Sequence, residues 1–185
     1  MLFKEIILSI LLIAVILLPL RMIYGLFAFM FRKDKSAMYM PSFNRHIRLM
    51  KNHLKLARWK RLVDWWCGDG KAMRFFADTF GLHCDGYELN FFPYLYGKLI
   101  NRLLWYTKLN LYKQDFFQAD LGRYDYIYVY LLPHQMADIE PRIFKHISDH
   151  AIIISNSFQF AVHKPYEVVK DKKGKASIFL YKKIQ

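Results

Sequence analysis

The chain has 185 residues, a formal net charge of +13 and a hydrophobic fraction of 55%. This length predicts one domain plus an appendage. The two cysteines, Cys67 and Cys84, match neither a C-x-x-C pair nor a disulfide framework, which indicates a reducing compartment. The seven histidines show no H-E-x-x-H or other ligand spacing, so we expect no metal site.

The N-terminal segment is strongly apolar. Ile6 to Leu20 is interrupted only by Ser9, and Met22 to Phe31 is apolar again after Arg21. Fifteen helical residues span roughly 22 Å, short of the ~30 Å hydrocarbon core, but the segment extended through its second half is long enough. We therefore predict a single-pass transmembrane helix within residues 1–35, with the arginine reaching towards headgroups. A signal peptide is the alternative, although no small-x-small cleavage site follows.

The basic charge is concentrated before residue 64. Residues 1–63 hold twelve Lys and Arg but only Glu5 and Asp34, a net of +10, whereas residues 64–185 hold sixteen basic and thirteen acidic residues, a net of +3. Most of the basic residues follow the apolar segment. The positive-inside rule then places the domain in the cytoplasm or its topological equivalent, with the mitochondrial inner membrane as the alternative location. Membrane lipids are expected partners of this basic run.

Nucleic-acid binding is a further interpretation, suggested by a pI of 9.7 and the abundant aromatic residues. The uneven charge argues against it, because the basic excess belongs to the predicted anchor region. We expect no nucleic-acid partner.

Residues 36–60 form a basic link between the anchor and the domain. Asn44 to Arg58 is expected to be an amphipathic helix, capped by Ser42 or by Asn44. One face carries Phe43, Ile47, Met50 and Leu54, and basic residues occupy much of the rest. Two interpretations stay open and are not exclusive. The helix packs on the domain with a solvated charged face, or it lies against both a membrane and a ligand pocket.

The predicted domain, residues 61–185, opens with a strand, a glycine turn, a helix and a second strand. The apolar run from Leu62 to Trp66 predicts a buried strand, which Gly68 and Gly70 end. Lys71 to Phe80 is helix-like and stops at Gly81, and His83 to Tyr87 is a second strand. Glu88 ends that strand, 20 residues after Gly68. At this separation an acid after the second strand meets a cofactor ribose.

The glycine turn favours S-adenosylmethionine over a dinucleotide. A dinucleotide site needs G-x-G-x-x-G/A, but the sequence from Gly68 to Met73 lacks the third small residue. Asp64 and Asp69 flank the turn, where two carboxylates would repel a pyrophosphate. They suit the cationic amino group and sulfonium of S-adenosylmethionine. The alternative for Asp69 is a plain helix N-cap.

The remaining elements alternate between helix and strand. We expect a helix at Phe91–Trp105, strands at Leu109–Lys113, Tyr124–Tyr130 and Ala151–Ile154, and a hairpin of Tyr166–Lys170 with Ser177–Tyr181. Pro141 is expected to start or kink a helix that leads to Ile147. Helices after the third and fifth strands should be reduced or absent. This order predicts the α/β class, a compact Rossmann-like doubly wound sheet with its ligand beyond the C-terminal strand ends.

The glycine turn resembles that of class I S-adenosylmethionine-dependent methyltransferases, whose first motif is D-x-G-x-G-x-G. Asp64, Gly68, Asp69 and Gly70 match it. Trp66 departs from it, because it stands where the family has its first glycine. A bulky side chain there would crowd the methionine moiety or force a different turn.

A narrower resemblance covers most of the chain. Met40-Pro41-Ser42, CGDGK, GYELN, LLPHQM and SFQF…HKP resemble the membrane-anchored protein-lysine methyltransferases of the mitochondrial adenine nucleotide translocase and the ATP synthase c subunit, with their bacterial relatives. The resemblance implies a methyltransferase anchored in the membrane that modifies a lysine of a membrane protein.

The same resemblance implies site residues. Cofactor binding is expected at Asp64, Cys67, Gly68, Asp69, Gly70, Glu88, Asn90, Asp115 and Phe116, the last two beside the adenine. Pro133 and His134 follow the fourth strand, where the family places its acceptor site. His134 is a candidate to accept a proton or orient the acceptor amine, or is simply exposed in a helix's first turn. An aromatic channel for lysine is expected from Phe91, Phe92, Tyr94, Tyr130 and Phe158. A small-molecule or lipid acceptor and a non-catalytic binding module are the alternatives.

Overall fold

The structure is a computed structural model that describes residues 5–9, 12–13, 15, 17 and 44–183. The chain divides into two compact units, Met1–Ser36 and Ala37–Gln185. In the first unit the described residues are helical and exposed. None of the helices in the described ranges is both long enough and apolar enough to cross a bilayer. The predicted anchor falls mostly on residues outside those ranges and stays a prediction.

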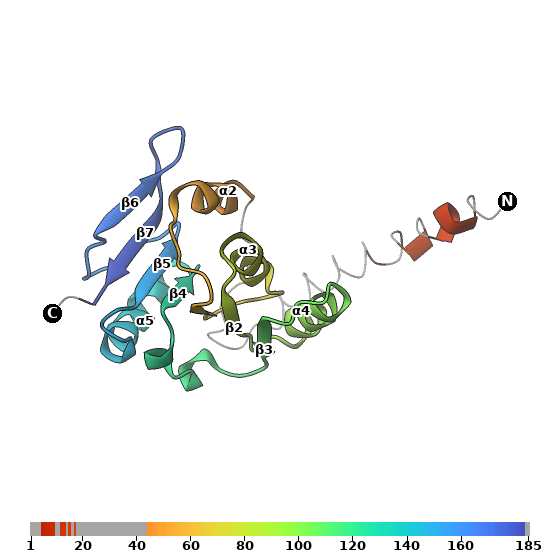
Figure 1. Ribbon diagram of the computed structural model, residues 1–185, viewed down its shortest axis with the longest axis horizontal. Coiled ribbons are helices and arrows are strands. Elements are labelled where there is room, and N and C mark those ends of the chain that lie inside the picture. The colour runs from red at the N-terminus through yellow and green to blue at the C-terminus, as the bar shows by residue number, and fades with distance from the viewer. Residues whose placement is uncertain (1–4, 10–11, 14, 16, 18–43, 184–185) are drawn as a thin grey trace. The chain divides into compact units, whose positions relative to one another are not determined.

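The second unit alternates strands and helices (Figure 1). Its helices are α2 (Asn44–His53), α3 (Lys71–Phe80), α4 (Phe91–Leu103) and α5 (Pro133–His146), with 3-10 turns η1 (Phe116–Gln118) and η2 (Leu121–Arg123). Its strands are β1 (Arg61–Asp64), β2 (His83–Tyr87), β3 (Leu109–Tyr112), β4 (Tyr126–Val129), β5 (Ile152–Asn156), β6 (Glu167–Lys170) and β7 (Ala176–Lys182). Only 3-10 turns separate β3 from β4, and no helix follows β5 within this unit, as predicted.

The seven strands form one sheet in the order β3-β2-β1-β4-β5-β7-β6. The first five strands are parallel, and β7 runs antiparallel to both β5 and β6. The chain leaves β1 towards β2 and β3 and later returns to the other side of β1 as β4. The strand order therefore reverses between β1 and β4, and ligands bind outside the carboxyl ends of the strands at such a point.

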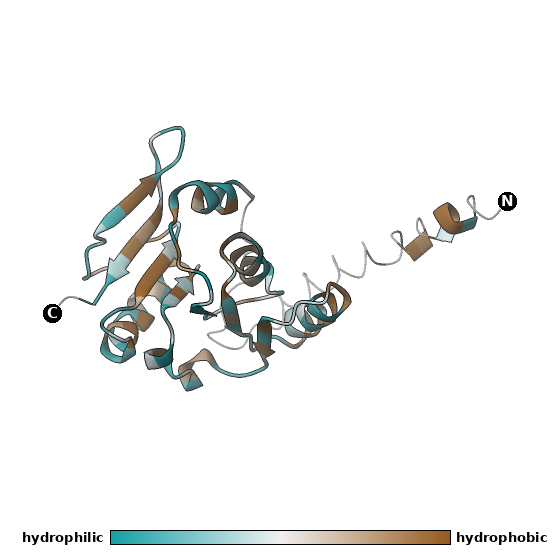
Figure 2. Cartoon of the chain, in the orientation of Figure 1, coloured by the Kyte–Doolittle hydropathy of each residue, from teal (hydrophilic) through white to brown (hydrophobic). Residues whose placement is uncertain are grey.

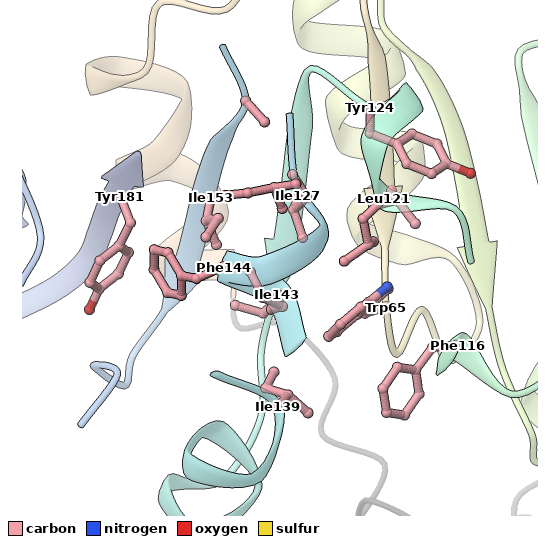
Figure 3. Close-up of a cluster of buried hydrophobic side chains, with 14 of the residues drawn as sticks. Trp65, Phe116, Leu121, Tyr124, Ile127, Ile139, Ile143, Phe144, Ile153 and Tyr181 are labelled. Atoms are coloured by element: carbon pink, nitrogen blue, oxygen red, sulfur yellow. The ribbon is translucent and has the colours of Figure 1, made fainter. Parts of the chain in front are cut away.

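Each face of the sheet has its own apolar core. On one face, α5 packs Ile139, Ile143 and Phe144 against strand residues such as Ile127 and Ile153 (Figure 3). On the other, α3 packs on the sheet through Met73 and Phe76, and α2 through Met50, with Leu54 just beyond it. Burial on both faces explains the apolar run of β5, which is mostly brown in Figure 2.

A buried carboxylate holds the segment that follows β5. Glu140 of α5 accepts hydrogen bonds from the backbone N–H groups of Ala161, Val162 and His163, and from His163 Nδ1 at 2.8 Å. Burial alone would raise the pKa of Glu140, but these hydrogen bonds bring it below its usual value. The segment keeps its place without a helix of its own.

Most predicted elements are confirmed, and the differences have local causes. α3 and β2 have the predicted bounds, and α5 runs through Pro141 rather than starting there. α2 ends at His53 and not at Arg58 as expected, because the residues that follow are hydrogen-bonded to other parts of the domain. The Ala57 N–H donates to the Tyr126 hydroxyl, and the Trp59 N–H donates to the Gly81 carbonyl. These bonds draw the chain along the domain towards β1.

Candidate functional site

The glycine turn lies at the carboxyl end of β1, beside the point where the strand order reverses. Gly68 and Gly70 adopt left-handed conformations, with φ of 55° and 76°. The Gly70 N–H donates to the Cys67 carbonyl at 2.8 Å, and the Cys67 N–H donates to the Tyr87 carbonyl at 3.1 Å. The turn is thereby closed on itself and fastened to β2. Side-chain-bearing residues rarely adopt these angles, so the two glycines are required by the turn.

Glu88 is hydrogen-bonded to this turn, and its predicted contact with a cofactor ribose stays a prediction. Its carboxylate accepts from the Gly68 N–H at 3.0 Å and from the backbone and side-chain N–H groups of Asn90 at 2.7 Å each. The side chain is 3% exposed, and burial raises its pKa. Asn90 therefore orients the carboxylate at the end of β2, where it is available to hydroxyl donors.

Asp64 is the second buried carboxylate of the site. It ends β1, is 3% exposed, and accepts one hydrogen bond from the Trp66 N–H at 3.3 Å. Burial raises its pKa to about 8, and the nearby Glu88 and Asp69 carboxylates add to the rise. Within residues 44–183, neither Asp64 nor Glu88 forms an ion pair. A cation brought to this edge of the sheet would relieve an existing electrostatic cost.

Asp69 is engaged with the protein. Its carboxylate accepts from the Lys71 N–H at 3.1 Å and pairs with the Arg74 guanidinium at 3.2 Å. Arg74 also donates to the Asp69 carbonyl at 2.7 Å and to the Asn101 side chain at 3.0 Å. The Asp69 side chain thus binds the first N–H group of α3, that of Lys71. The N-cap alternative is wrong in its position, because the N-cap residue is Gly70 and has no side-chain cap. Of the two carboxyl groups expected to face a cationic ligand, Asp64 is the one without a cationic partner among residues 44–183.

Two further glycines let neighbouring elements approach the turn. A Cβ at Gly86 of β2 would lie 2.8 Å from Cys67 Sγ, and one at Gly97 of α4 would lie 2.6 Å from the Asp69 carbonyl oxygen. Burial raises the pKa of the Cys67 thiol well above its usual value. Cys67 therefore supports the site by its backbone and its packing, and α4 lies directly on the turn.

Trp66 and Phe116 pack against each other. Their ring centroids lie 4.2 Å apart, and Phe116 also contacts Trp65 at 4.8 Å. The bulky residue in place of the family's first glycine thus belongs to the apolar core, and the turn keeps its two left-handed glycines. Asp115 accepts from the Phe117 N–H at 2.9 Å and caps η1. Their contact with an adenine stays a prediction.

Pro133 and His134 lie in the first turn of α5, after β4, and both are exposed. Gln135 reaches back, its side-chain oxygen accepting from the Leu132 N–H at 3.2 Å. The residues of the expected aromatic channel separate: Phe91 and Phe92 are exposed on α4, whereas Tyr130 and Phe158 are partly buried after β4 and β5. The channel stays a prediction.

A polar cluster that forms at the ends of β4 and β5 was not identified from the sequence. The Ser157 hydroxyl lies 3.2 Å from His46 Nδ1 of α2 and donates to the Asn156 side-chain oxygen, and the Asn156 amide donates to the Tyr128 hydroxyl at 2.9 Å. Ser157 adopts a left-handed φ of 72°, which is strained for this residue type. The SFQF motif was the available signal, but its partner at residue 46 lies 111 positions away.

These features fit S-adenosylmethionine. Two buried carboxylates without ion pairs suit its cationic amino acid end and its ribose hydroxyls, and the left-handed glycines allow close approach. With a parallel sheet that reverses between β1 and β4, they define a class I S-adenosylmethionine-dependent methyltransferase.

Comparison with known proteins agrees with this class. The family model described as the ANTKMT methyltransferase domain matches residues 64–167, more than half of the chain. The chain therefore belongs to this family, which bears out both the predicted family and S-adenosylmethionine as its cofactor. No match was found among curated proteins.

Solved structures share the fold. An RNA methyltransferase from Salinibacter ruber in complex with S-adenosyl-L-homocysteine is 20% identical, with a TM-score of 0.70 over 77% of this chain and 93% of that one. MtNAS in complex with MTA and tNA is 15% identical, with a TM-score of 0.66 over 76% of this chain and 61% of that one. A geranyl diphosphate C-methyltransferase from Streptomyces coelicolor A3(2) is 17% identical, with a TM-score of 0.52 over 60% and 43%. At these identities the likeness extends to the fold alone.

Proposed function

We propose that the protein is a membrane-anchored methyltransferase that modifies a lysine of a membrane protein. The observation that carries the methyl-donor site is the buried pair Asp64 and Glu88, which form no ion pair among the described residues and end adjacent strands at the reversal of the sheet. Membrane anchoring is supported by the apolar residues 6–31 and by the net charge of +10 in residues 1–63. The lysine acceptor rests on the resemblance of the motifs.

Each residue of the proposed donor site has its own role. Asp64 faces the cationic end of the cofactor and Glu88 its ribose, while Gly68 and Gly70 shape the turn. Cys67, Asp69 and Asn90 hold these groups in place, and Asp115 and Phe116 border the adenine. Pro133 and His134 stand on the acceptor side.

Bound S-adenosylmethionine supplies an activated methyl group on its sulfonium. The protein has to align donor and acceptor, a contribution of about 7–11 kcal/mol in well-oriented reactions. It also has to present the lysine as a free amine, which partial burial favours by desolvating the ammonium. Burial, followed by the nearby Arg45 charge, lowers the pKa of His46, so its imidazole is neutral at neutral pH. In the proposed reaction His46, which lies beside Ser157, takes up the lysine proton.

The test is methyl transfer from radioactive S-adenosylmethionine into total membrane protein. We expect label in one or a few membrane proteins, recovered as methyl-lysine after acid hydrolysis. Glu88→Gln should abolish it, whereas the matched control Asp138→Asn, an exposed carboxylate on α5, should leave it unchanged.

Calorimetric titration with S-adenosylhomocysteine separates the parts of the proposal. Binding without transfer to any acceptor would indicate a non-catalytic module. Label in lipid or small molecules would replace the lysine acceptor, and no binding by the wild type would refute the donor site.

A further inference from the structure

The helix α4 turns an apolar face to solvent. Six of its side chains are between 47% and 62% exposed: Phe91, Phe92, Leu95, Tyr96, Leu99 and Leu103. We call these six residues the outward face of α4. Just beyond the helix, Trp105 is 86% exposed. Single exposed apolar residues are ordinary, but a continuous apolar helix face marks an interaction site.

The outward face follows from the helical period. At 100° per residue its six residues fall within one sector, and the buried Gly97 and Asn101 fall on the opposite side. That opposite side is fixed to the domain, since Gly97 lies on the Asp69 backbone and Asn101 accepts from Arg74. Because α4 is held from behind, its apolar sector cannot be buried by rolling the helix inward.

The surroundings of this face are basic. The sequence between Glu88 and Asp115 contains no acidic residue and four basic ones, Lys98, Arg102, Lys108 and Lys113. Lys98 and Arg102 are exposed on α4. By the helical period Lys98 lies just outside the outward face and Arg102 lies within it, near the same edge. Lys113 lies 5.0 Å from the centroid of the Phe91 ring. A partner for this face therefore has to be both apolar and anionic.

We propose that the outward face of α4 docks into the interfacial layer of an anionic lipid bilayer. An apolar helix face with aromatic residues and flanking Lys and Arg has the composition of interfacial helices. A second copy of the chain would bring two basic edges together, and so would the chain's own basic residues 32–63. The apolar residues 6–31 are the segment that the proposed function already assigns to the bilayer. Anionic lipid satisfies the apolar face and the charges at once, at about 1 kcal/mol per well-placed basic residue.

Docking through α4 would also orient the donor site. The helix begins directly after Glu88 and Asn90, and its Gly97 contacts the glycine turn at Asp69. The cofactor turn is thus rigidly connected to the docking helix. This inference deepens the proposed function and rests on its membrane location, because it specifies which side of the domain meets the bilayer.

Spin-label accessibility in the full-length protein tests the inference. The native Cys67 and Cys84 are buried, so a single label can be placed at Leu99→Cys, with Lys172→Cys at the exposed β6–β7 turn as the matched control. Each protein is reconstituted into phosphatidylcholine vesicles with or without phosphatidylglycerol. In the anionic vesicles we expect the Leu99 label to be severalfold more accessible to dissolved oxygen than to an aqueous nickel chelate, and the Lys172 label to show the reverse.

Each other outcome overturns a distinct statement. A Leu99 label accessible to the nickel chelate, in protein that still floats with the vesicles, refutes docking through α4 and leaves the proposed function intact. Protein that fails to float refutes the membrane location itself. A label shielded from both oxygen and nickel is covered by protein, either residues 1–43 or a second copy, and refutes a lipid partner. If the Leu99 label is protected from the nickel chelate equally well in vesicles that lack phosphatidylglycerol, the requirement for anionic lipid is refuted.

Discussion

At the scale of single residues, the donor site is built around a carboxylate placed where its charge is unfavourable. Asp64 is buried beside Glu88 and within reach of the Asp69 charge, and its pKa is about 8 as a result. A folded protein normally offsets such a cost with an ion pair, as Asp69 does with Arg74. In the described part of the chain Asp64 instead has no cationic partner, which suits a residue that awaits a cationic ligand.

This cost predicts a pH-dependent difference between the wild type and Asp64→Asn. The folded pKa of about 8 exceeds the unfolded value of 3.8, so the folded state binds more protons between these pH values. The contribution of Asp64 to stability is therefore lost as pH rises from about 4 to 8. At about pH 4 the ligand-free proteins should melt alike, and from there to about pH 8 the variant should gain stability over the wild type by up to about 1.4 kcal/mol per pH unit.

Thermal melts across this pH range measure the effect. Asp138→Asn, at an exposed position, should track the wild type throughout. A difference between Asp64→Asn and wild type that does not change with pH would contradict the assigned ionisation.

At the scale of elements, α4 and the glycine turn are joined by one close contact. The backbone of Gly97 approaches the Asp69 carbonyl so closely that a Cβ would lie 2.6 Å from it. The contact needs no left-handed conformation, since Gly97 lies within a helix. Glycine is required at position 97 only because a side chain there would clash with the glycine turn.

Gly97→Ala should therefore destabilise the protein, although alanine is the better helix former by about 1 kcal/mol. We expect a net loss of about 1–3 kcal/mol in the free energy of unfolding, with weaker binding of S-adenosylhomocysteine. Denaturant unfolding and calorimetry measure the two effects. Gly122→Ala is the control, since a Cβ there meets nothing nearer than 3.4 Å. Equal stability of both variants would show that α4 can move away from the turn without cost.

The sequence predicts elements better than it predicts which face of an element is buried. Apolar runs and glycine stops located α3 and β2 at their observed bounds. The recurrence of Leu95, Leu99 and Leu103 indicated a helix, but the structure leaves all three exposed. Periodicity identifies a helix, whereas the buried side depends on which elements pack behind it, here the turn at Asp69.

The donor site could be predicted from local signals, and the polar cluster could not. The glycines after the first strand and the acid after the second strand are separated by the spacing that is typical of a cofactor site. The bonds of His46 to Ser157 and of Asn156 to Tyr128 join residues that are distant in the sequence, and no local pattern encodes them.

At the scale of the whole molecule, the donor site is formed where several elements of the second unit end. β1 supplies Asp64, β2 leads into Glu88, and the turn between them supplies the glycines. The three are connected by backbone hydrogen bonds of Gly68 and Cys67. A ligand bound there adds to the cohesion of the parallel half of the sheet, and its effect should reach global stability.

Saturating S-adenosylhomocysteine should therefore raise the melting temperature. At about 100 times its Kd a ligand stabilises the folded state by about 2.7 kcal/mol, roughly 5–10 °C for a domain of this size. Differential scanning fluorimetry of the full-length protein measures the shift. Glu88→Ala should lose most of it, while Glu167→Gln on the edge strand β6 should keep it. An equal shift in Glu88→Ala would place the ligand elsewhere.

The hydrogen bonds of Glu140 have a consequence for how short such an enzyme can be. One carboxylate gathers three consecutive backbone amides and His163, and so holds a segment that has no helix to stabilise it. The Tyr181 hydroxyl holds the same segment at a second point, since it accepts from the Phe160 N–H at 3.1 Å. Two side chains of the domain thus do the work of a helix, and the chain can pass from β5 to the last two strands without one.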